Sequence, residues 1–377
     1  MNILVIPSWY PNGTDKLMGI YHKEFCEALS KDKNINVNML YVDRQRLNAP
    51  IKYLFMNKDE VVKEKGYNVY IKKMLDVHKI NDEWQIKRYC KTLDKLFKKY
   101  LKENPKPDVI HAHVTLPAGY AACVLGKKYN IPVVVTEHAS YYKRFFEGKN
   151  KKYGDFVLKN AKFTTVSNYM AKEINKDCSI IPNLVDTEVF KKKRNKVKGL
   201  KLITVSALRQ GKRIDDIIAA LKLIVEKENL EDVKLTIVGD GFLEDYYKKR
   251  CQELGMNDYV EFTGRMNNKE EVANILIKNN IFVIASEMET FCIPGVEALA
   301  SGLPVVSTKC LGPEEYIDES CGKLVEVGNI NDLAKAIIDV YNNIDNYDVN
   351  YLRSVADKFS RDTVRNIALD IYKEVRK

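Results

Sequence analysis

ETFCIPGVEALASGLPVVST, from Glu289 to Thr308, predicts a loop, a helix and a strand, in that order. Pro294 suits the first turn of a helix, where its missing N–H costs nothing, and Gly302 with Pro304 ends that helix. The apolar run Ile281 to Ala285 precedes the stretch and predicts a parallel strand buried on both faces. This alternation of strands and helices indicates an open α/β sheet.

The loop from Glu289 to Ile293 falls at the carboxyl end of a strand, where open α/β sheets bind ligands. Free N–H groups and the positive dipole at the amino end of the following helix favour an anion, typically a phosphate. Glu297 follows Glu289 by eight positions, and carboxylates are natural acceptors for sugar hydroxyls. A plain structural interpretation stands beside this one, because Glu297 in a first helical turn favours the dipole and Glu289 fits a solvated loop.

This pattern of two glutamates resembles the signature of the retaining GT-B enzymes of glycosyltransferase family 4, in which the second Glu is followed by a run such as ALASGLPVV. The resemblance implies that Glu289 lies against the donor sugar and the phosphates, and that Glu297 binds the ribose hydroxyls. Thr290 and Cys292 stand where the family has glycine, so these departures bear on the donor sugar. The donor-binding residues implied in this stretch are Glu297, Phe291, Cys292 and Ile293.

Length and composition fit two domains, because 377 residues with 45% hydrophobic content allow a full core in each half. No run approaches the roughly 18 apolar residues that cross a bilayer. The opening NILVIP predicts a strand rather than a signal peptide, so a cytoplasmic protein is expected. The eight cysteines form no Cys-x-x-Cys or Cys/His cluster, and no Asp-x-Asp pair occurs, so no metal or other cofactor is expected.

The net charge of +10 comes mostly from lysine. No helix-turn-helix, zinc-finger or RNP-like pattern accompanies it, which argues against nucleic acid as a partner. The segment YYKRFFEGKNKKYGDF, residues 141–156, mixes aromatic residues with five basic ones. It fits peripheral contact with an anionic membrane at the inner face of the cell membrane, and it fits a charged, solvated helix equally well.

The amino-terminal stretch predicts a strand, a loop rich in Pro, Gly and Asn, and an amphipathic helix around Tyr21 to Leu29. Gly19 lies where loop and helix meet; the resemblance implies close approach of backbone to the donor phosphates or the acceptor, and a turn glycine is the alternative. Ile35 to Val42 predicts a second strand. The region from about Arg44 to Lys79 is charged and predicted to be irregular, and the resemblance implies that it is acceptor-specific.

DVIHAHVTLPAGYAACVLGKKYNIPVVVTEHAS predicts two parallel strands, Asp108 to Val114 and Pro132 to Thr136, joined by a helix. His111 and His113 share one face of the first strand, but only His113 is near its carboxyl end, so His111 is expected in the core. His138 follows the second strand. The resemblance to the family's His-Ala-His and Thr-x-His runs implies that His138 lies beside the donor sugar, with His113 second.

Cations are needed where a nucleoside diphosphate leaves, because negative charge grows on it. The family supplies an Arg and, five residues on, a Lys; Lys212 matches the Lys, Ala207 stands at the Arg position, and Arg209 lies two positions later. In the family a strand with a Gly-x-Gly turn at its end lines the nucleotide site, and Gly239 and Gly241 match that turn. Arg265 follows the next strand, near where the base is expected to lie.

The predicted fold is α/β with GT-B architecture, two Rossmann-like domains with parallel sheets that face a central cleft. The acceptor-side domain is expected over 1–190, completed by a carboxyl-terminal helix at 361–377, and the donor-binding domain over 191–360. The polar run KKKRNKVKG marks the boundary. Residues expected to act in the reaction are Glu289, His138, Lys212 and Arg209.

The implied activity is retaining transfer of a hexosyl or N-acetylhexosaminyl group from a nucleotide sugar to a glycan or lipid-linked acceptor in cell-surface polysaccharide synthesis. A UDP-sugar is favoured over a GDP-sugar as donor. Two alternatives stay open. A GT-B-like UDP-sugar epimerase would need no acceptor, and a non-catalytic nucleotide-sugar-binding subunit would not turn the donor over.

Overall fold

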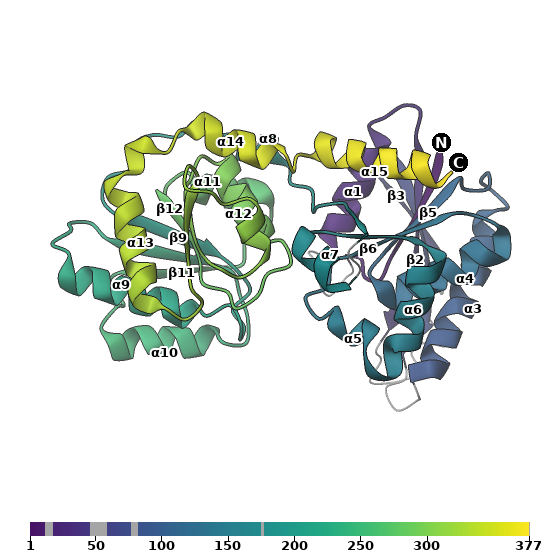
Figure 1. The fold of residues 1–377 in the computed structure, drawn as a ribbon, viewed down its shortest axis with the longest axis horizontal. Coiled ribbons are helices and arrows are strands. Elements are labelled where there is room, and N and C mark those ends of the chain that lie inside the picture. Colours follow the sequence, from purple (N-terminus) through teal and green to yellow (C-terminus); the bar gives the residue numbers. More distant parts are fainter. Residues whose placement is uncertain (12–17, 46–58, 77–81, 175–176, 377) are drawn as a thin grey trace. The chain divides into compact units, whose positions relative to one another are not determined.

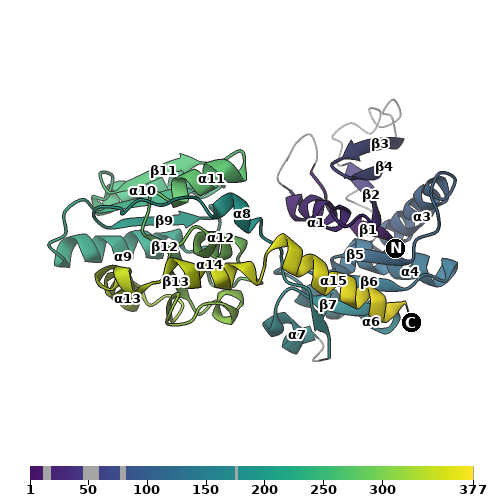
Figure 2. The same cartoon turned by 90° about the horizontal axis from the view of Figure 1, so that it is seen from above.

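The computed structural model describes residues 1–11, 18–45, 59–76, 82–174 and 177–376, which form two compact units (Figure 1). Unit 1 comprises Met1–Pro182 and Val364–Lys377, and unit 2 comprises Asn183–Thr363. Each unit has its own sheet, covered by helices on both faces (Figure 2). No helix of the described residues has the length and apolar character needed to span a membrane.

Unit 1 is built on an eight-stranded sheet of order β3-β4-β2-β1-β5-β6-β7-β8. All neighbouring strands are parallel except β3 and β4. The strands are β1 (Asn2–Pro7), β2 (Asn36–Gln45), β3 (Asp59–Glu64), β4 (Tyr67–Leu75), β5 (Val109–His113), β6 (Val133–Glu137), β7 (Lys162–Thr165) and β8 (Ser179–Ile180). The helices are α1 (Ile20–Ser30), α3 (Asp82–Tyr100), α4 (Tyr120–Tyr129), α5 (Lys143–Phe146), α6 (Lys151–Asn160), α7 (Asn168–Ile174) and α15 (Arg361–Val375), with short turns at Thr115–Gly119 and Gly148–Asn150.

Alternate residues of β5 show which helices cover each face of this sheet. Ile110 and Ala112 pack into a core with α3 and α4. His111 lies on the other face, edge-on to Phe25 of α1 and hydrogen-bonded to Tyr372 of α15. The prediction that His111 is a core residue is therefore confirmed.

Two strands correct the sequence prediction for the first unit. The region from Arg44 to Lys79 was predicted to be irregular, yet β3 and β4 form an antiparallel hairpin there. The sequence pattern for a strand was weak because β3 is an edge strand with largely exposed, charged side chains. Gly66, at a φ of 88°, makes the turn between the strands and was the available clue. Residues 46–58 and 77–79 of that region lie outside the described residues.

Unit 2 is built on a six-stranded parallel sheet of order β11-β10-β9-β12-β13-β14. The strands are β9 (Lys201–Val205), β10 (Lys234–Val238), β11 (Val260–Gly264), β12 (Ile281–Ile284), β13 (Val305–Thr308) and β14 (Gly322–Val325). The helices are α8 (Thr187–Phe190), α9 (Ile214–Lys227), α10 (Glu244–Leu254), α11 (Lys269–Leu276), α12 (Ile293–Ala300), α13 (Ile330–Asn342) and α14 (Val349–Asp357), with short turns at Gly312–Glu315 and Ile344–Asn346. The strand, helix and strand predicted from the opening stretch are confirmed as β12, α12 and β13.

Both sheets have a topological switch point, where the chain's winding reverses direction. In unit 1 it lies between β1 and β5, and in unit 2 between β9 and β12. Strand order of this kind is that of the doubly wound Rossmann arrangement, in which ligands bind beyond the carboxyl ends of the strands at the switch point. Two places in the molecule are therefore candidates for a site.

Candidate active site

The loops after β9 and β12 meet at the switch point of unit 2. The N–H of Glu287 donates to the carbonyl of Gly211 at 2.9 Å, which joins the two loops. The Lys212 ammonium forms an ion pair with the Glu289 carboxylate, and their side chains are 15% and 14% exposed. Ser286 Oγ donates to the same Glu289 Oε1 at 2.7 Å. The structure thus brings together a predicted cation and a predicted carboxylate that are 77 positions apart in the sequence.

The backbone of Glu289 is fixed by the loop after β13. Its N–H donates to the carbonyl of Cys310 at 2.8 Å, and its carbonyl accepts from Gly312 at 2.9 Å. A Cβ added to Gly312 would lie 2.6 Å from the nitrogen of Phe291, so only glycine allows this close approach. The position of the carboxylate is therefore set by two neighbouring loops.

The residue just before helix α12 has a left-handed backbone conformation. Cys292 has a φ of 68° and precedes the first residue of the helix, Ile293, while Pro294 lies in the first turn as predicted. The hydroxyl of Tyr316 donates to the carbonyl of Cys292 at 3.1 Å. Burial, with Glu289 nearby, raises the pKa of the Cys292 thiol well above its usual range. The thiol is therefore protonated at neutral pH and adds no charge to the anion site.

The side chain of Phe291 anchors the loop. It is buried, with its ring 5.0 Å from the ring of Phe359 and 6.0 Å from that of Tyr316, measured between centroids. Any contact with a ligand from this residue would come from its backbone.

Glu297 lies one turn further into α12 than predicted. The helix begins at Ile293, so its first turn holds no acidic residue and Glu297 belongs to the second turn. The side chain is only 7% exposed. A buried carboxylate is costly unless it is hydrogen-bonded, and the second turn places Glu297 behind the loop that carries Glu289.

The predicted glycines Gly239 and Gly241 allow the loop after β10 to pack against the loop after β9. A Cβ on Gly239, whose φ is 136°, would lie 1.9 Å from the carbonyl oxygen of Ser206, and one on Gly241 would lie 2.3 Å from that of Leu208. The N–H of Leu208 donates to the carbonyl of Asp240 at 2.8 Å. Both glycines therefore have a structural role in shaping the edge of this site.

The remaining predicted cations of unit 2 are exposed. Arg209 lies on the loop after β9, and Arg265 directly after β11. Sequence reasoning missed a third cation, Arg213, which caps α9 and pairs with Asp216 and Glu287. Its only sequence signal was its place beside Lys212.

Four of the chain's five histidines meet at the switch point of unit 1. The ring of His113 lies 4.2 Å from that of His111, 4.7 Å from that of His22 and 5.1 Å from that of His138, between centroids. His113 Nδ1 and His138 Nε2 are 2.9 Å apart and share a hydrogen bond. His22 was missed by sequence reasoning, and the structure shows that it is a buried residue of α1.

Burial keeps three of these four histidines, His22, His111 and His113, uncharged. Burial first, and the neighbouring histidines second, lower the pKa of His22 and His113 well below the usual value and that of His111 to about 3. In the described structure both ring nitrogens of His22, His113 Nε2 and the hydroxyl of Tyr21 have no hydrogen-bond partner. Even so, no group of three or more His, Cys, Asp or Glu among the described residues could hold a metal ion.

A chain of hydrogen bonds fixes the tautomer of His111. Thr164 Oγ1 donates to the carbonyl of Val135 at 3.2 Å, so it accepts from Thr136 Oγ1 at 2.6 Å. Thr136 Oγ1 in turn accepts from His111 Nε2 at 2.7 Å, and the Tyr372 hydroxyl donates to His111 Nδ1 at 2.5 Å. In this direction every hydrogen of the chain has an acceptor, so His111 carries its hydrogen on Nε2.

Glu137 orients the loop that carries His138. Its fully buried carboxylate accepts from the N–H and hydroxyl of Thr115 at 2.8 and 2.6 Å, and from the N–H groups of His138 and Ala139 at 2.9 and 2.8 Å. Burial raises the pKa of Glu137, and these four hydrogen bonds oppose that rise. Sequence reasoning missed Glu137, although a carboxylate at the last position of a buried strand was the available signal.

Gly19 caps α1 in the left-handed region, with a φ of 72°. A Cβ there would lie 2.8 Å from the carbonyl oxygen of Trp9, so the turn requires glycine.

The basic segment 141–156 forms α5, a short turn and the first part of α6. Tyr142, Phe145 and Tyr153 are buried in it, whereas Tyr141 is exposed.

Comparisons with known proteins agree with this geometry. Residues 185–351 match the family model for glycosyl transferases group 1, and residues 44–189 match that for glycosyltransferase family 4. An uncharacterized glycosyltransferase of Methanocaldococcus jannaschii is 30% identical over 257 residues, 65% of this chain and 68% of that protein. A putative teichuronic acid biosynthesis glycosyltransferase of Bacillus subtilis, TuaC, is 26% identical over 89% of this chain and 88% of its own.

Solved structures share the whole fold. Anabaena HepE in complex with UDP superposes with a TM-score of 0.74 at 16% identity, covering 99% of this chain and 100% of its own. Sucrose-phosphate synthase from Thermosynechococcus elongatus gives 0.73 at 19% identity, covering 100% of this chain and 99% of its own. With the two Rossmann-ordered sheets, this likeness confirms the predicted GT-B fold.

Proposed function

The chain belongs to the glycosyl transferases group 1, and from this premise we propose that it is a retaining transferase of hexosyl or N-acetylhexosaminyl groups that uses a nucleotide sugar. The observation that carries the proposal is the Lys212–Glu289 pair beside the amino end of α12. A cation, a helix amino end and a carboxylate at a switch point suit a diphosphate joined to a sugar.

The proposed roles follow from the chemistry of each group. Lys212 and the N–H groups at the start of α12 bind the diphosphate, Glu289 accepts a hydrogen bond from a sugar hydroxyl, and Glu297 accepts from the ribose. As the sugar C1–O bond breaks, negative charge grows on the diphosphate and Lys212 stabilises it. The acceptor hydroxyl attacks from the same face and gives its proton to the leaving phosphate oxygen. No metal is needed in this proposal.

We propose a UDP-sugar as donor, which the structures of HepE with UDP and with UDP-glucose support for a protein of the same fold. Arg209 and Arg265 are proposed as further phosphate or base contacts. Unit 1 is proposed to bind a glycan or lipid-linked acceptor of cell-surface polysaccharide synthesis, as the name of TuaC suggests for that relative. His138 is proposed to contact the reacting sugar, on the family resemblance.

The test is a panel of UDP- and GDP-sugars without acceptor, scored by thermal shift and by slow release of nucleoside diphosphate. One donor is expected to stabilise the protein and to be hydrolysed slowly. Glu297→Gln is expected to lose both effects, whereas Glu253→Gln on exposed α10 should keep them. Isomerised sugar nucleotide in the mixture would instead favour an epimerase, and tight binding without turnover a non-catalytic subunit. Binding unchanged in Glu297→Gln would contradict the assigned site.

A further inference from the structure

A groove between helices of unit 1 combines an apolar floor with a surplus of lysine. It lies between α3 and α6, over α4, and has a volume of about 390 Å³. Half-buried apolar side chains form its floor and walls, among them Cys90, Val124 and Phe156. Volumes of roughly 300–1,000 Å³ are typical of ligand sites.

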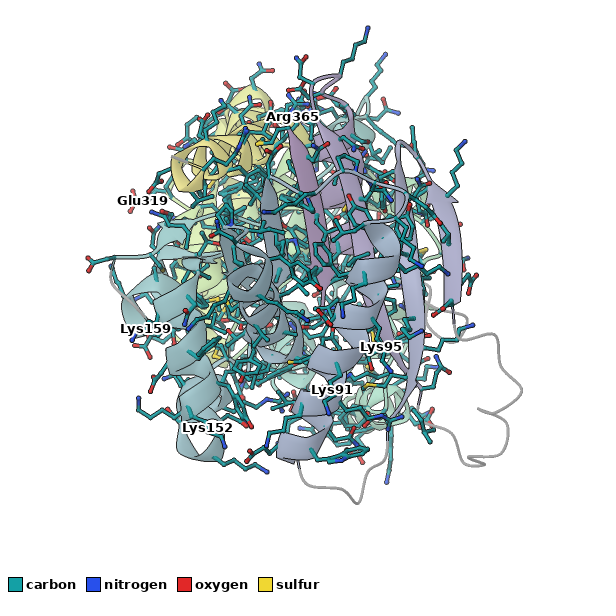
Figure 3. The ribbon with its side chains drawn as sticks, turned by 90° about the vertical axis from the view of Figure 1, so that its right-hand side faces the viewer. Lys91, Lys95, Lys152, Lys159, Glu319 and Arg365 are labelled. Carbon is teal, nitrogen blue, oxygen red and sulfur yellow. The ribbon has the colours of Figure 1, made fainter. Side chains whose placement is uncertain are left out.

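Lysines follow both helices along this groove. Lys87, Lys91 and Lys95 are spaced four apart, so they form one exposed stripe on α3. Lys152 and Lys159 are seven apart on α6, and Figure 3 shows Lys91, Lys95, Lys152 and Lys159 on one face of the molecule. We call these five lysines the basic stripe. Like charges spaced four apart cost helix stability, so Lys91 and Lys95 do not stabilise α3 through each other.

Only one carboxylate lining the groove offsets this charge. Glu83 accepts from both Lys87 and Lys152 at 3.0 Å, and so bridges α3 and α6. Among the described residues, Lys91, Lys95 and Lys159 make no ion pair or hydrogen bond. The stripe therefore keeps a positive charge that is open to an outside partner.

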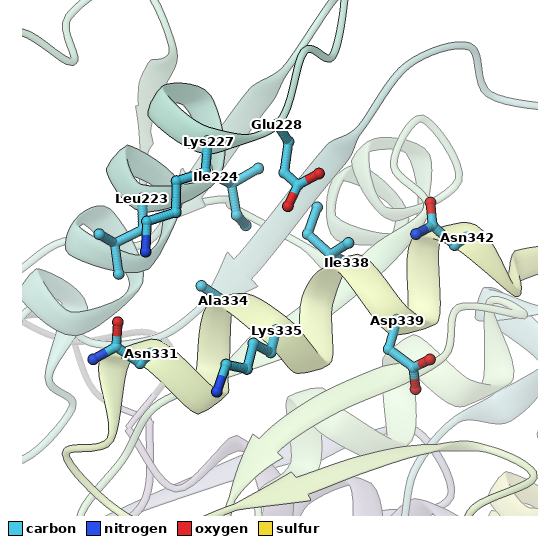
Figure 4. Close-up of a pocket in the computed structure, with 10 residues that line it drawn as sticks. All are labelled: Leu223, Ile224, Lys227, Glu228, Asn331, Ala334, Lys335, Ile338, Asp339 and Asn342. Atoms are coloured by element: carbon cyan, nitrogen blue, oxygen red, sulfur yellow. The ribbon is translucent and has the colours of Figure 1, made fainter.

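A second groove of similar size shows that such charge is not a general property of grooves between helices. It lies between α9 and α13 of unit 2 and has a volume of about 330 Å³ (Figure 4). Its lysines, Lys227 and Lys335, are balanced by Glu228 and Asp339. The groove of unit 2 therefore lacks the surplus of positive charge that lines the α3/α6 groove.

An exposed tryptophan lies at the start of the basic stripe. Trp84 is 44% exposed, with the guanidinium of Arg88 5.1 Å from its ring centroid. Positions 84, 88, 91 and 95 share one face of α3. Tryptophan beside lysine is the composition that favours the interface of a bilayer, because the ring enters the headgroup region while the ammonium groups reach lipid phosphates.

We propose that this face of unit 1, the α3/α6 groove with its basic stripe and Trp84, docks on an anionic lipid bilayer. The lysines meet lipid phosphates, and the apolar groove accepts part of an acyl chain. A protein partner with acidic side chains would use the lysines but leave the apolar floor uncovered. The basic aromatic segment 141–156 contributes Lys152 to the basic stripe and Phe156 to the apolar groove.

The experiment measures binding of the full chain to vesicles in roughly 0.1 M salt, without any sugar nucleotide. Phosphatidylglycerol vesicles should bind it and phosphatidylcholine vesicles should not. Each lysine at a bilayer surface is worth about 1 kcal/mol, so Lys91→Ala/Lys95→Ala should weaken binding about 30-fold. The matched variant Lys227→Ala/Lys335→Ala removes two lysines from the balanced groove and should bind like the original chain.

A second readout places the contact on α3. Brominated phosphatidylglycerol should quench tryptophan fluorescence of the original chain, and Trp84→Phe should remove that quenching. Equal binding to both lipids, equal loss in the two double variants, or quenching that survives Trp84→Phe would overturn the proposal. Donor hydrolysis is measured separately, so a failure here leaves the proposed transferase activity unaffected.

Discussion

The two switch points hold the same place in their sheets and use opposite electrostatics. In unit 2 the switch point carries fixed charges, the Lys212 ammonium and the Glu289 carboxylate, at the edge of solvent. In unit 1 it carries three buried, neutral imidazoles, those of His22, His111 and His113. The difference teaches that one strand order can hold either a charged pair at the edge of solvent, suited to a diphosphate, or a buried polar cluster without charge.

The largest expected difference between the two switch points is the loss of stability of unit 1 at acidic pH. A native pKa below the unfolded value means that protons bind mainly to the unfolded chain, so stability is complete above pH about 6.5 and falls as pH decreases. Three such groups, His22, His111 and His113, would lower the free energy of unfolding by up to about 4 kcal/mol per pH unit below that value. Amide hydrogen exchange between pH 7 and 5 measures this.

All five histidines belong to the sequence of unit 1, which makes unit 2 an internal control. Exchange protection in β5 and β6 should fall first, while β9 and β12 keep theirs over the same range. Equal loss in both sheets would contradict the role given to the histidine cluster.

The charge at the switch point of unit 2 should matter for chemistry more than for folding. Lys212→Met removes the cation proposed to stabilise the leaving diphosphate, and kcat should fall about 10²–10³-fold, or about 3–4 kcal/mol. Donor turnover measured with the best sugar nucleotide gives this number. Lys222→Met, which removes an exposed lysine paired with Glu226 on α9, serves as the control and should change kcat little. A normal kcat in Lys212→Met would remove Lys212 from the mechanism.

A substitution of Glu137 tests whether the hydrogen bonds that its carboxylate accepts stabilise the loops at the switch point of unit 1. In Glu137→Gln an NH₂ group replaces one acceptor oxygen and faces backbone donors, so we expect a loss of about 2–3 kcal/mol in unfolding free energy. Denaturant unfolding of the variant gives the value. Glu147→Gln, at an exposed site in the same unit, should stay within about 0.5 kcal/mol. A similar result for both variants would show that the four hydrogen bonds of Glu137 are dispensable.

The sequence predicted the unit 2 site better than that of unit 1, for a physical reason. The Glu289 loop and Lys212 each adjoin a strand and a helix with strong local signals, including Pro294 and Gly302. His22 and Glu137 were missed because their importance comes from contacts between distant segments. No local pattern on α1 reveals that His22 will meet His113, 91 positions later, once the sheet is formed.

The hairpin of β3 and β4 was missed for a related reason. An edge strand gains its order from hydrogen bonds to its neighbour, and its charged side chains give no apolar alternation. The fold was predictable because buried parallel strands contain apolar runs, as in IFVI of β12 and VVV of β6.

The smallest expected effect concerns which ring nitrogen of His111 carries the hydrogen. The Tyr372 hydroxyl donates to His111 Nδ1, so Tyr372→Phe leaves that nitrogen without its donor and should cost about 1 kcal/mol. A stability change of this size is also expected from lost packing, so the decisive readout is the imidazole ¹⁵N NMR spectrum. His111 is expected to show hydrogen on Nε2 in the original chain and a shifted Nδ1 resonance in the variant. Tyr351→Phe in unit 2, whose hydroxyl bonds exposed Asp318, should leave the imidazole signals unchanged. Hydrogen found on Nδ1 of His111 in the original chain would reverse the chain of donors through Thr136 and Thr164.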